Sequence, residues 1–287
     1  MKFGVLYHYW GKDWACDYIH TAHKVKEAGF DIMEIGANHL HDMSRSELEN
    51  LKDVSRELNL VLTTNIGPTR EYDLSSGDPE VRKAGVRYIT ETMKNMDFVG
   101  SRDIAGAMYS FWPSDFVDTD KSAAWEHSIP EMQKIARVAE DLGIECSLEV
   151  LNRFETYILT DCKEGLEYIR RVGSGNVKLL LDTFHMNIEE DNLPNALRLA
   201  GDKLGHFHVG EGNRKLPGMG SMPWDEMGRA LRDIRYSKSV VIEPFMRCGG
   251  EIAKPIHIWR DLTEGADEAT MDRNLRKSLA FLKDKFN

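Results

Sequence analysis

The sequence predicts an α/β protein of the (β/α)8 TIM barrel class, folded as a single domain over residues 1–287. Short apolar runs alternate with long amphipathic stretches from end to end, and this alternation occurs eight times. Strict alternation predicts parallel strands joined by right-handed crossovers. Eight units favour closure into a barrel over an open doubly wound sheet, and no glycine-rich phosphate loop follows the first run. The chain length is ordinary for such a barrel.

The eight predicted strands are short apolar segments, at residues 3–7, 32–36, 61–65, 104–109, 145–149, 177–182, 204–208 and 240–243. Amphipathic stretches between them predict helices at about 15–28, 46–58, 79–97, 123–142, 162–172, 192–201, 225–235 and 268–285. Gly29 and Gly143 are expected helix stops. Ser44 or Ser46 before Glu47, and Asp78 before Pro79, are expected helix starts.

Three connections are long for a barrel, at residues 67–77, 110–122 and 247–267. Each follows the C-terminal end of a predicted strand, which is the end where barrel enzymes build their active sites. We therefore expect the active site at the C-terminal ends of the strands. The last connection either closes over the mouth of the barrel or contacts another subunit.

The charge and hydropathy of the chain exclude several partners. The net charge of −10 and the isoelectric point near 5.5 argue against a nucleic acid, whose phosphates need a basic face. No apolar stretch approaches the ~18 residues of a membrane span, and the run at residues 3–7 is too short for a signal peptide. We expect a cytoplasmic protein that binds neither nucleic acid nor membrane.

The last four predicted strands each end in a residue that can bind a metal, spaced about one strand-plus-helix unit apart: Glu149, Asp182, His208 and Glu243. A barrel would gather them around one mouth. Three carboxylates and an imidazole suit a hard or borderline divalent ion such as Mn²⁺, Mg²⁺ or Co²⁺. The alternative is that each acid caps a helix or pairs with a basic side chain. That explanation fits one strand end better than four in succession.

Further polar side chains follow these strand ends. Glu155, His185 and Arg214 each lie in the connection after a strand. Taken singly, such residues are more often solvated loop residues than substrate ligands. Together they would rim a polar cup with donors and acceptors for hydroxyl groups.

Several long motifs resemble the ketose 3-epimerases that act on D-psicose (allulose) and D-tagatose, within the xylose isomerase-like TIM barrel superfamily. The resemblance spans the whole chain and includes the aromatic residues at 9–10, Trp14 and the segment at 109–113. Its most specific motifs are LEVLNRFE (148–155), LDTFHMNIEE (181–190), GHFH (205–208), GEGNR (210–214), EPFMR (243–247) and WRD (259–261).

The resemblance implies one divalent cation per subunit, Mn²⁺ or Co²⁺ before Mg²⁺, held by Glu149, Asp182, His208 and Glu243. It implies that Glu149 and Glu243 are the catalytic residues that transfer the proton. By the same resemblance, the O1–O3 end of the sugar is gripped by Glu155, His185 and Arg214. The rest of the ketose would be lined by Leu6, Tyr7, Ala107 and Trp112.

The implied reaction is epimerisation of free ketohexoses at C3, for D-fructose and D-psicose and also for D-tagatose and D-sorbose. A proton leaves C3 next to the C2 carbonyl, and a metal-bound cis-enediolate is the expected intermediate. Inversion needs an acid on the opposite face, so two carboxylates would exchange roles, each contributing ~10²–10⁴-fold. The chain departs from the family pattern at Leu6 and His8, which bears on the choice of sugar.

Other readings stay open. An aldose–ketose isomerase or an inosose-processing enzyme could use the same barrel, although the isomerase would need a second metal site and a lysine near O1. An abasic-site endonuclease would need a histidine-rich zinc cluster and a basic face. A non-catalytic sugar-binding barrel would bind without turnover. The resemblance also implies a homodimer or homotetramer, since the family commonly forms both.

Overall fold

The computed structural model describes residues 1–114 and 120–287, and its strands close into a barrel. Neighbouring strands pair in parallel around the whole ring, with β8 paired to β1. The predicted TIM barrel is therefore confirmed. The strands are β1 (Lys2–Leu6), β2 (Ile32–Gly36), β3 (Val61–Ile66), β4 (Asp103–Gly106), β5 (Glu145–Val150), β6 (Val177–Asp182), β7 (Leu204–Val209) and β8 (Ser239–Ile242).

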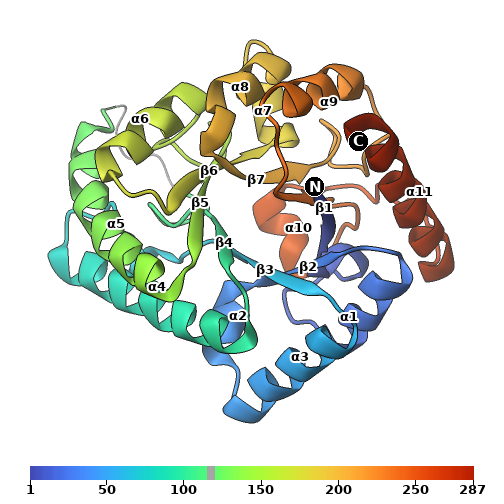
Figure 1. The fold of residues 1–287 in the computed structure, drawn as a ribbon, viewed down its shortest axis with the longest axis horizontal. Helices are drawn as coiled ribbons and strands as arrows, with labels where there is room; N and C mark the ends of the chain where they lie inside the picture. The colour runs from blue at the N-terminus through green and yellow to red at the C-terminus, as the bar shows by residue number, and fades with distance from the viewer. Residues whose placement is uncertain (115–119) are drawn as a thin grey trace.

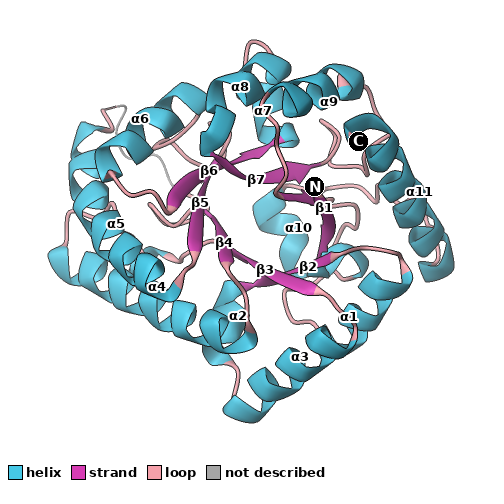
Figure 2. Ribbon diagram, viewed as in Figure 1, coloured by secondary structure: helices cyan, strands magenta, loops and turns pink. Residues whose placement is uncertain are grey.

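Helices form an outer ring around the strands (Figure 1), and Figure 2 shows the separation of the two layers. The long crossover helices match the predicted ones to within about three residues at each end. They are α1 (Tyr18–Glu27), α3 (Arg45–Glu57), α4 (Pro79–Val99), α5 (Ser122–Leu142), α6 (Cys162–Val172), α8 (Leu193–Ala200), α9 (Trp224–Asp233) and α11 (Glu268–Phe286).

The predicted start and stop signals act as expected. Ser44 caps α3 in a capping box with Glu47. The Asp78 side chain accepts a hydrogen bond from the backbone N–H of Glu80 at the start of α4. Gly143 ends α5 with a φ of +64°, in the left-handed region that a side chain disfavours. These local signals fix where the crossovers begin and end.

The fourth strand is shorter than predicted, because it ends at Gly106 and not at residue 109. Gly106 has a φ of +116°, and a Cβ there would lie 2.2 Å from the carbonyl oxygen of Ile66. The chain therefore turns out of the sheet at this glycine. Tyr7 also lies outside its predicted strand, since it opens the 3-10 helix η1 (Tyr7–Trp10).

Short segments of helix that the sequence did not predict follow several strands. They are α2 (Ala37–Asp42), α7 (Thr183–Glu189), α10 (Gly250–Ile256), η2 (Arg70–Tyr72) and η3 (Gly201–Lys203). Each is near or below the length at which amphipathic periodicity can be recognised. Four of them, α2, α7, α10 and η2, follow the C-terminal ends of strands and shape the mouth of the barrel.

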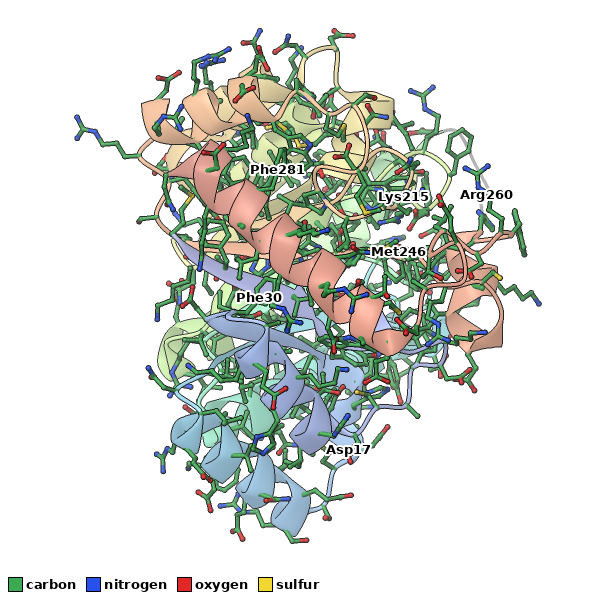
Figure 3. All side chains as sticks on the ribbon, turned by 90° about the vertical axis from the view of Figure 1, so that its right-hand side faces the viewer. Asp17, Phe30, Lys215, Met246, Arg260 and Phe281 are labelled. Atoms are coloured by element: carbon green, nitrogen blue, oxygen red, sulfur yellow. The ribbon has the colours of Figure 1, made fainter. Side chains whose placement is uncertain are left out.

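The long connection after β8 closes over the barrel mouth. It contains α10, which is seen within the ring of strands in Figure 1, and Pro255 and Ile256 of this helix line the central pocket. Figure 3 looks onto α11, which lies between α9 and α1 in the outer ring of helices. Arg260 projects outward from the rim in the same view. Of the predicted connection at 110–122, residues 115–119 lie outside the described part of the chain.

Within residues 1–114 and 120–287, no helix has the length and apolar content needed to cross a bilayer.

Candidate active site

The four predicted metal ligands come together at the mouth of the barrel. Each of Glu149, Asp182, His208 and Glu243 offers one ligand atom, and these atoms lie within 4.8 Å of one another. All four side chains are buried. Glu149 and Asp182 lie at the C-terminal ends of β5 and β6. His208 lies near the end of β7, and Glu243 directly follows β8.

His208 is oriented by a carboxylate beneath it. Nε2 of His208 hydrogen-bonds Oε1 of Glu34 at 2.7 Å, and Glu34 is an ionised acceptor because His206 and His208 outweigh the burial that would raise its pKa. Nε2 therefore carries a proton, and Nδ1 faces the cluster. Nδ1 makes no hydrogen bond within the described part of the chain, where its nearest carboxylate oxygen is Oε1 of Glu243 at 3.4 Å.

Asp182 both caps a helix and faces the cluster. Its Oδ1 accepts a hydrogen bond from the backbone N–H of Phe184 at 2.6 Å, which starts α7. Its Oδ2 is buried and finds no hydrogen-bond partner among the residues that the structure describes, and Nη1 of Arg214 lies 3.8 Å away. The helix-cap explanation is therefore correct for one oxygen and leaves the other without a role.

These orphaned atoms fit a cation. A buried unpaired donor or acceptor costs about 1–3 kcal/mol, and here His208 Nδ1 and Asp182 Oδ2 converge with two more carboxylates. Three oxygens and one nitrogen form a set typical of Mn²⁺, Mg²⁺ or Co²⁺. The cluster is consistent with one divalent metal ion.

The protonation of the cluster without a cation shows how strongly its charges interact. Burial raises the pKa of Glu149 well above its ordinary range, and the nearby Glu243 carboxylate adds to the rise. Burial also works to raise the pKa of Glu243, but His208 outweighs it and holds that pKa below the ordinary value. Burial lowers the pKa of His208, yet Glu243 and Glu34 raise it well above 6.5. A bound cation would replace these protons.

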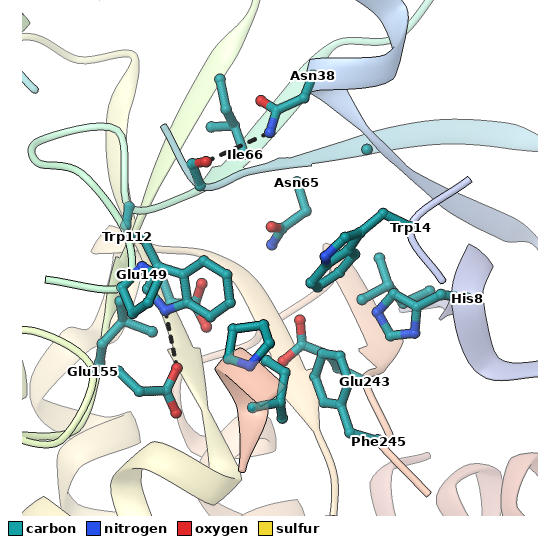
Figure 4. Close-up of a pocket in the computed structure, with 18 of the residues that line it drawn as sticks. His8, Trp14, Asn38, Asn65, Ile66, Trp112, Glu149, Glu155, Glu243 and Phe245 are labelled. Atoms are coloured by element: carbon teal, nitrogen blue, oxygen red, sulfur yellow. Dashed lines mark hydrogen bonds between the residues drawn. The ribbon is translucent and has the colours of Figure 1, made fainter. Parts of the chain in front are cut away.

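Glu155 lies at the other side of the pocket and is held by three donors. Oε1 accepts from Nδ2 of Asn152 at 3.1 Å and from Nη2 of Arg214 at 3.2 Å. Oε2 accepts from Nε1 of Trp112 at 3.0 Å, as the dashed line in Figure 4 marks. Burial raises the pKa of Glu155, but His185 and Arg214 outweigh it and keep the carboxylate ionised.

His185 presents an N–H to the cluster. Its Nδ1 accepts a hydrogen bond from the backbone N–H of Asn152 at 3.2 Å, so Nε2 carries the proton. Nε2 lies 3.5 Å from Oε1 of Glu149. Burial lowers the pKa of His185, which favours the neutral ring. The side chain can therefore donate one hydrogen bond to a substrate oxygen.

Arg214 lies between the carboxylates of Glu155 and Glu243 and contacts both. Nη2 reaches Glu155, while Nη1 lies 3.4 Å from Oε2 of Glu243. The guanidinium stacks over the ring of Phe184, 3.6 Å from its centroid, with Phe245 at 4.9 Å. The residue has a φ of +65°, so the loop after β7 holds it in an uncommon backbone conformation.

A pocket of about 420 Å³ opens above the cluster and has the size of a small-molecule site. Its lining includes all seven residues predicted to bind the sugar, namely Leu6, Tyr7, Ala107, Trp112, Glu155, His185 and Arg214. Glu149 and Glu243 enter it from two sides (Figure 4), while Asp182 and His208 are not among its lining residues. The structure therefore brings every predicted site residue to one place.

A chain of polar side chains that the sequence did not predict runs down the inside of the barrel from the cluster. Oε2 of Glu34 accepts from Oγ1 of Thr63 at 2.8 Å and lies 3.1 Å from Nε2 of His206. Nδ1 of His206 hydrogen-bonds Oδ2 of Asp103 at 2.6 Å. A carboxylate within the otherwise apolar residues 32–36 was the available signal for Glu34. No feature of the sequence marked Asp103 as the partner of His206.

Pocket residues outside the predicted set were also missed. They come from the end of β3 and from α2, where no motif announced them, and they include Asn38, His39, Asn65 and Ile66. His8 and Trp14 also line the pocket, and the sequence marked His8 only as a departure from the family pattern. Trp14 was singled out only as part of the resemblance.

Comparison with known proteins gives a consistent result. The family described as xylose isomerase-like TIM barrel matches residues 22–285. A D-psicose 3-epimerase of Ruminiclostridium cellulolyticum is 45% identical over 282 residues, which cover 98% of this chain and 96% of the relative. A D-psicose 3-epimerase of Agrobacterium fabrum is 44% identical over 282 residues, covering 98% of both chains. A crystal structure of the D-psicose 3-epimerase from Clostridium cellulolyticum H10 with D-tagatose superposes with a TM-score of 0.98 at 44% identity, covering all of both chains.

Proposed function

Since the chain belongs to the xylose isomerase-like TIM barrel family and is a ketose 3-epimerase, we propose that it inverts C3 of free ketohexoses. D-fructose and D-psicose are the first candidates, because relatives at 44–45% identity are named D-psicose 3-epimerases. D-tagatose and D-sorbose are the second pair. One relative was solved with D-tagatose, which supports including that pair.

One observation supports this reaction most strongly. Glu149 and Glu243 come from strands three apart around the ring, yet both carboxylates belong to the same cluster and line the same pocket. Inversion at carbon requires removal of a proton on one face and delivery on the other. Two carboxylates that enter from different sides suit this requirement, whereas a single base returns the proton to its own face.

Glu149 and Glu243 would therefore act as the base and acid pair and exchange roles with the direction of the reaction. The proton on C3 is acidic because C2 is a carbonyl, and its loss gives a cis-enediolate. A divalent cation bound at the cluster would act as a Lewis acid and lower the pKa of the C3 proton. Each carboxylate is expected to contribute ~10²–10⁴-fold to the rate.

Glu155, His185 and Arg214 would orient the O1–O3 end of the sugar. They offer a charged acceptor, a single N–H donor and a planar fork, all buried and held by other groups. Such fixed partners place the reacting carbon without loss of side-chain freedom during binding. Leu6, Tyr7, Ala107 and Trp112 would line the rest of the ketose, with Trp112 presenting its face to C–H groups.

We propose Mn²⁺ or Co²⁺ as the cation, with Mg²⁺ as the weaker alternative. The imidazole nitrogen of His208 is a softer ligand than the oxygens that Mg²⁺ prefers. The buried, partner-free Nδ1 of this ring supports a metal that accepts nitrogen.

A homodimer or homotetramer is part of the same proposal. Two large apolar side chains are exposed near the mouth, Trp259 at 73% and Phe154 at 64% of their surface. They share a second pocket with Ile258 and Leu262, next to Glu155 and Arg214. Exposed apolar surface of this kind commonly marks a protein contact.

The proposed reaction is tested by incubating the metal-free protein with D-fructose, D-psicose, D-tagatose and D-sorbose after adding Mn²⁺, Co²⁺, Mg²⁺ or EDTA. Chromatography of the products separates the alternatives. We expect C3 epimers, fastest with Mn²⁺ or Co²⁺, and none with EDTA. Formation of an aldose, or no product at saturating metal, would contradict the proposal. Sedimentation velocity on the same protein gives the assembly state.

A further inference from the structure

Two polar atoms at the edge of the pocket are buried and have no hydrogen-bond partner among residues 1–114 and 120–287. They are Nε2 of His8 and Nδ2 of Asn65, and both residues line the pocket. Figure 4 shows His8 on the opposite side of the pocket from Glu155 and Asn65 at its upper edge, with Trp14 between the two and Glu243 below. A buried polar atom without a partner is costly, so each points to a ligand group that the protein alone does not supply.

His8 is fixed in place by aromatic rings. It stacks on Phe245 with ring centroids 4.5 Å apart and meets the edge of Trp14 at 5.7 Å. The side chain is only 4% exposed. Burial lowers the pKa of His8 to about 3, and the ring bonds its own backbone, so the imidazole is neutral with one nitrogen donating to a carbonyl. Nε2 is then a lone-pair acceptor suited to a hydroxyl group.

Asn65 supplies the complementary group. It is two residues after Thr63 in β3, so its side chain lies on the same face of the strand, one layer nearer the mouth. The amide nitrogen is a donor with two protons. Neighbouring polar residues of the pocket are already paired, since Asn38 accepts from Tyr88 at 2.9 Å and His39 bonds Tyr18 at 2.6 Å. His8 and Asn65 differ from them in carrying a buried polar atom that has no partner among the described residues.

We infer that His8 and Asn65 recognise hydroxyl groups on the C4–C6 half of the ketose, His8 as acceptor and Asn65 as donor. This inference rests on the proposed function, in which Glu155, His185 and Arg214 hold the O1–O3 end. The far half of the sugar then extends toward the opposite side of the pocket, where these two atoms lie. The consequence is a preference for a six-carbon ketose with its tail hydroxyls over a ketopentose or a deoxy sugar.

The experiment is a cycle that crosses side-chain changes with hydroxyl deletions. The kcat/KM and the dissociation constant of the Mn²⁺-loaded protein are measured for D-fructose, for its 4-deoxy, 5-deoxy and 6-deoxy analogues and for D-xylulose, which lacks C6. The proteins are wild type, His8→Phe, His8→Gln and Asn65→Leu. Phenylalanine keeps the stack on Phe245 and removes only the acceptor, whereas glutamine returns an acceptor oxygen.

We expect His8→Phe to lose roughly 5–20-fold in kcat/KM for D-fructose, the effect of one hydrogen bond. For the deoxy analogue that lacks the recognised hydroxyl, the ratio of the wild-type kcat/KM to the variant kcat/KM should fall to about one. His8→Gln should recover part of the loss. Asn65→Leu should show the same pattern, with its own deoxy analogue insensitive to the change.

A control is Leu6→Val, which alters the apolar lining and removes no hydrogen-bonding group, so it should change kcat/KM by a similar factor for D-fructose and its three deoxy analogues. A loss for His8→Phe and Asn65→Leu that is equal across the five sugars would overturn the inference and leave a packing role. A wild-type protein that binds D-fructose without epimerising it would contradict the proposed function instead. In that case the dissociation constants complete the same cycle and decide the inference.

Discussion

Glu34 and His208 are 174 positions apart in the chain and form a 2.7 Å hydrogen bond inside the barrel. The contact sets which nitrogen of His208 faces the carboxylate cluster. Glu34 is in turn held by Thr63 and pairs with His206. Carboxylates in this position fix the ring orientation and raise the basicity of a metal-binding imidazole.

Glu34→Gln should therefore weaken metal binding although Glu34 is not in the cluster. The amide keeps the shape of the side chain and removes its charge, so Nδ1 of His208 becomes a poorer ligand. We expect the dissociation constant for Mn²⁺ to rise about 10–100-fold, measured by titration calorimetry. Thr63→Val is the matched control, because it removes a hydrogen bond to Glu34 and keeps the contact with His208. Equal Mn²⁺ affinity in wild type and Glu34→Gln would contradict the assigned role.

Glu149→Gln and Glu243→Gln should each abolish epimerisation, even under conditions where metal still binds. Each substitution removes one of two proton carriers, for which we expect at least ~10²–10⁴-fold slower formation of D-psicose from D-fructose. Metal content measured by mass spectrometry on the same samples separates loss of the carboxylate base from loss of the cation. Activity near half of wild type in either variant would remove that residue from the proton path.

The fold could be predicted from the sequence because alternation of apolar runs and amphipathic stretches is a long-range, redundant signal. The details that failed are local. β4 ends early, at Gly106, which has a positive φ and leaves no room for a Cβ beside the carbonyl oxygen of Ile66. The helix α7 is seven residues long and begins at Asp182 itself, which the prediction treated only as a strand end. Neither feature produces a pattern long enough to detect.

The grouping of Glu149, Asp182, His208 and Glu243 could be predicted because a parallel barrel brings the C-terminal ends of its strands together. Glu34, His206 and Asp103 could not be predicted, because their roles depend on contacts across the barrel interior between β2, β7 and β4. The same limit applies to His8 and Asn65. Their significance lies in a missing partner, and a missing partner is visible only once the neighbours are placed.

The buried chain from Glu34 to Asp103 should make stability depend on pH. Burial lowers the pKa of His206, but Glu34 and Asp103 outweigh it and raise that pKa to about 9. Because this pKa is higher in the folded than in the unfolded protein, protonated His206 stabilises the fold fully below the unfolded value of 6.5. That stabilisation is lost as the pH rises through 9. Glu34 has a lowered pKa, so its contribution is present above its ordinary 4.5 and lost in acid. The chain therefore contributes most between about pH 5 and 6.5.

The measurement is urea unfolding with EDTA at pH 6 and pH 9.5, for wild type and His206→Gln. We expect the difference in unfolding free energy between the two proteins to shrink by on the order of 3 kcal/mol at the higher pH. Titrations elsewhere cancel in the difference. An unchanged difference across this range would show that His206 does not carry a charge in the folded protein.

Arg214→Lys should be severely impaired although it preserves the charge. Only the guanidinium fork can reach Glu155 and Glu243 together while stacking on Phe184. An ammonium group would lose one of these contacts and the stack, and we expect kcat/KM for D-fructose to fall about 10²-fold. Arg153→Lys is the control, since that arginine pairs with Glu189 on the surface. Equal losses in the two variants would argue against a special role for the fork.

The position of solvent hydrogen in the product tests the central claim most directly. Metal-free protein is loaded with Mn²⁺, incubated with D-fructose in D₂O, and the sugars are analysed by NMR. Proton exchange between two carboxylates and C3 predicts deuterium at C3 of D-psicose, and at no other carbon. Deuterium at C1 or C2 with formation of an aldose, or D-psicose that keeps its original hydrogen at C3, would contradict the account.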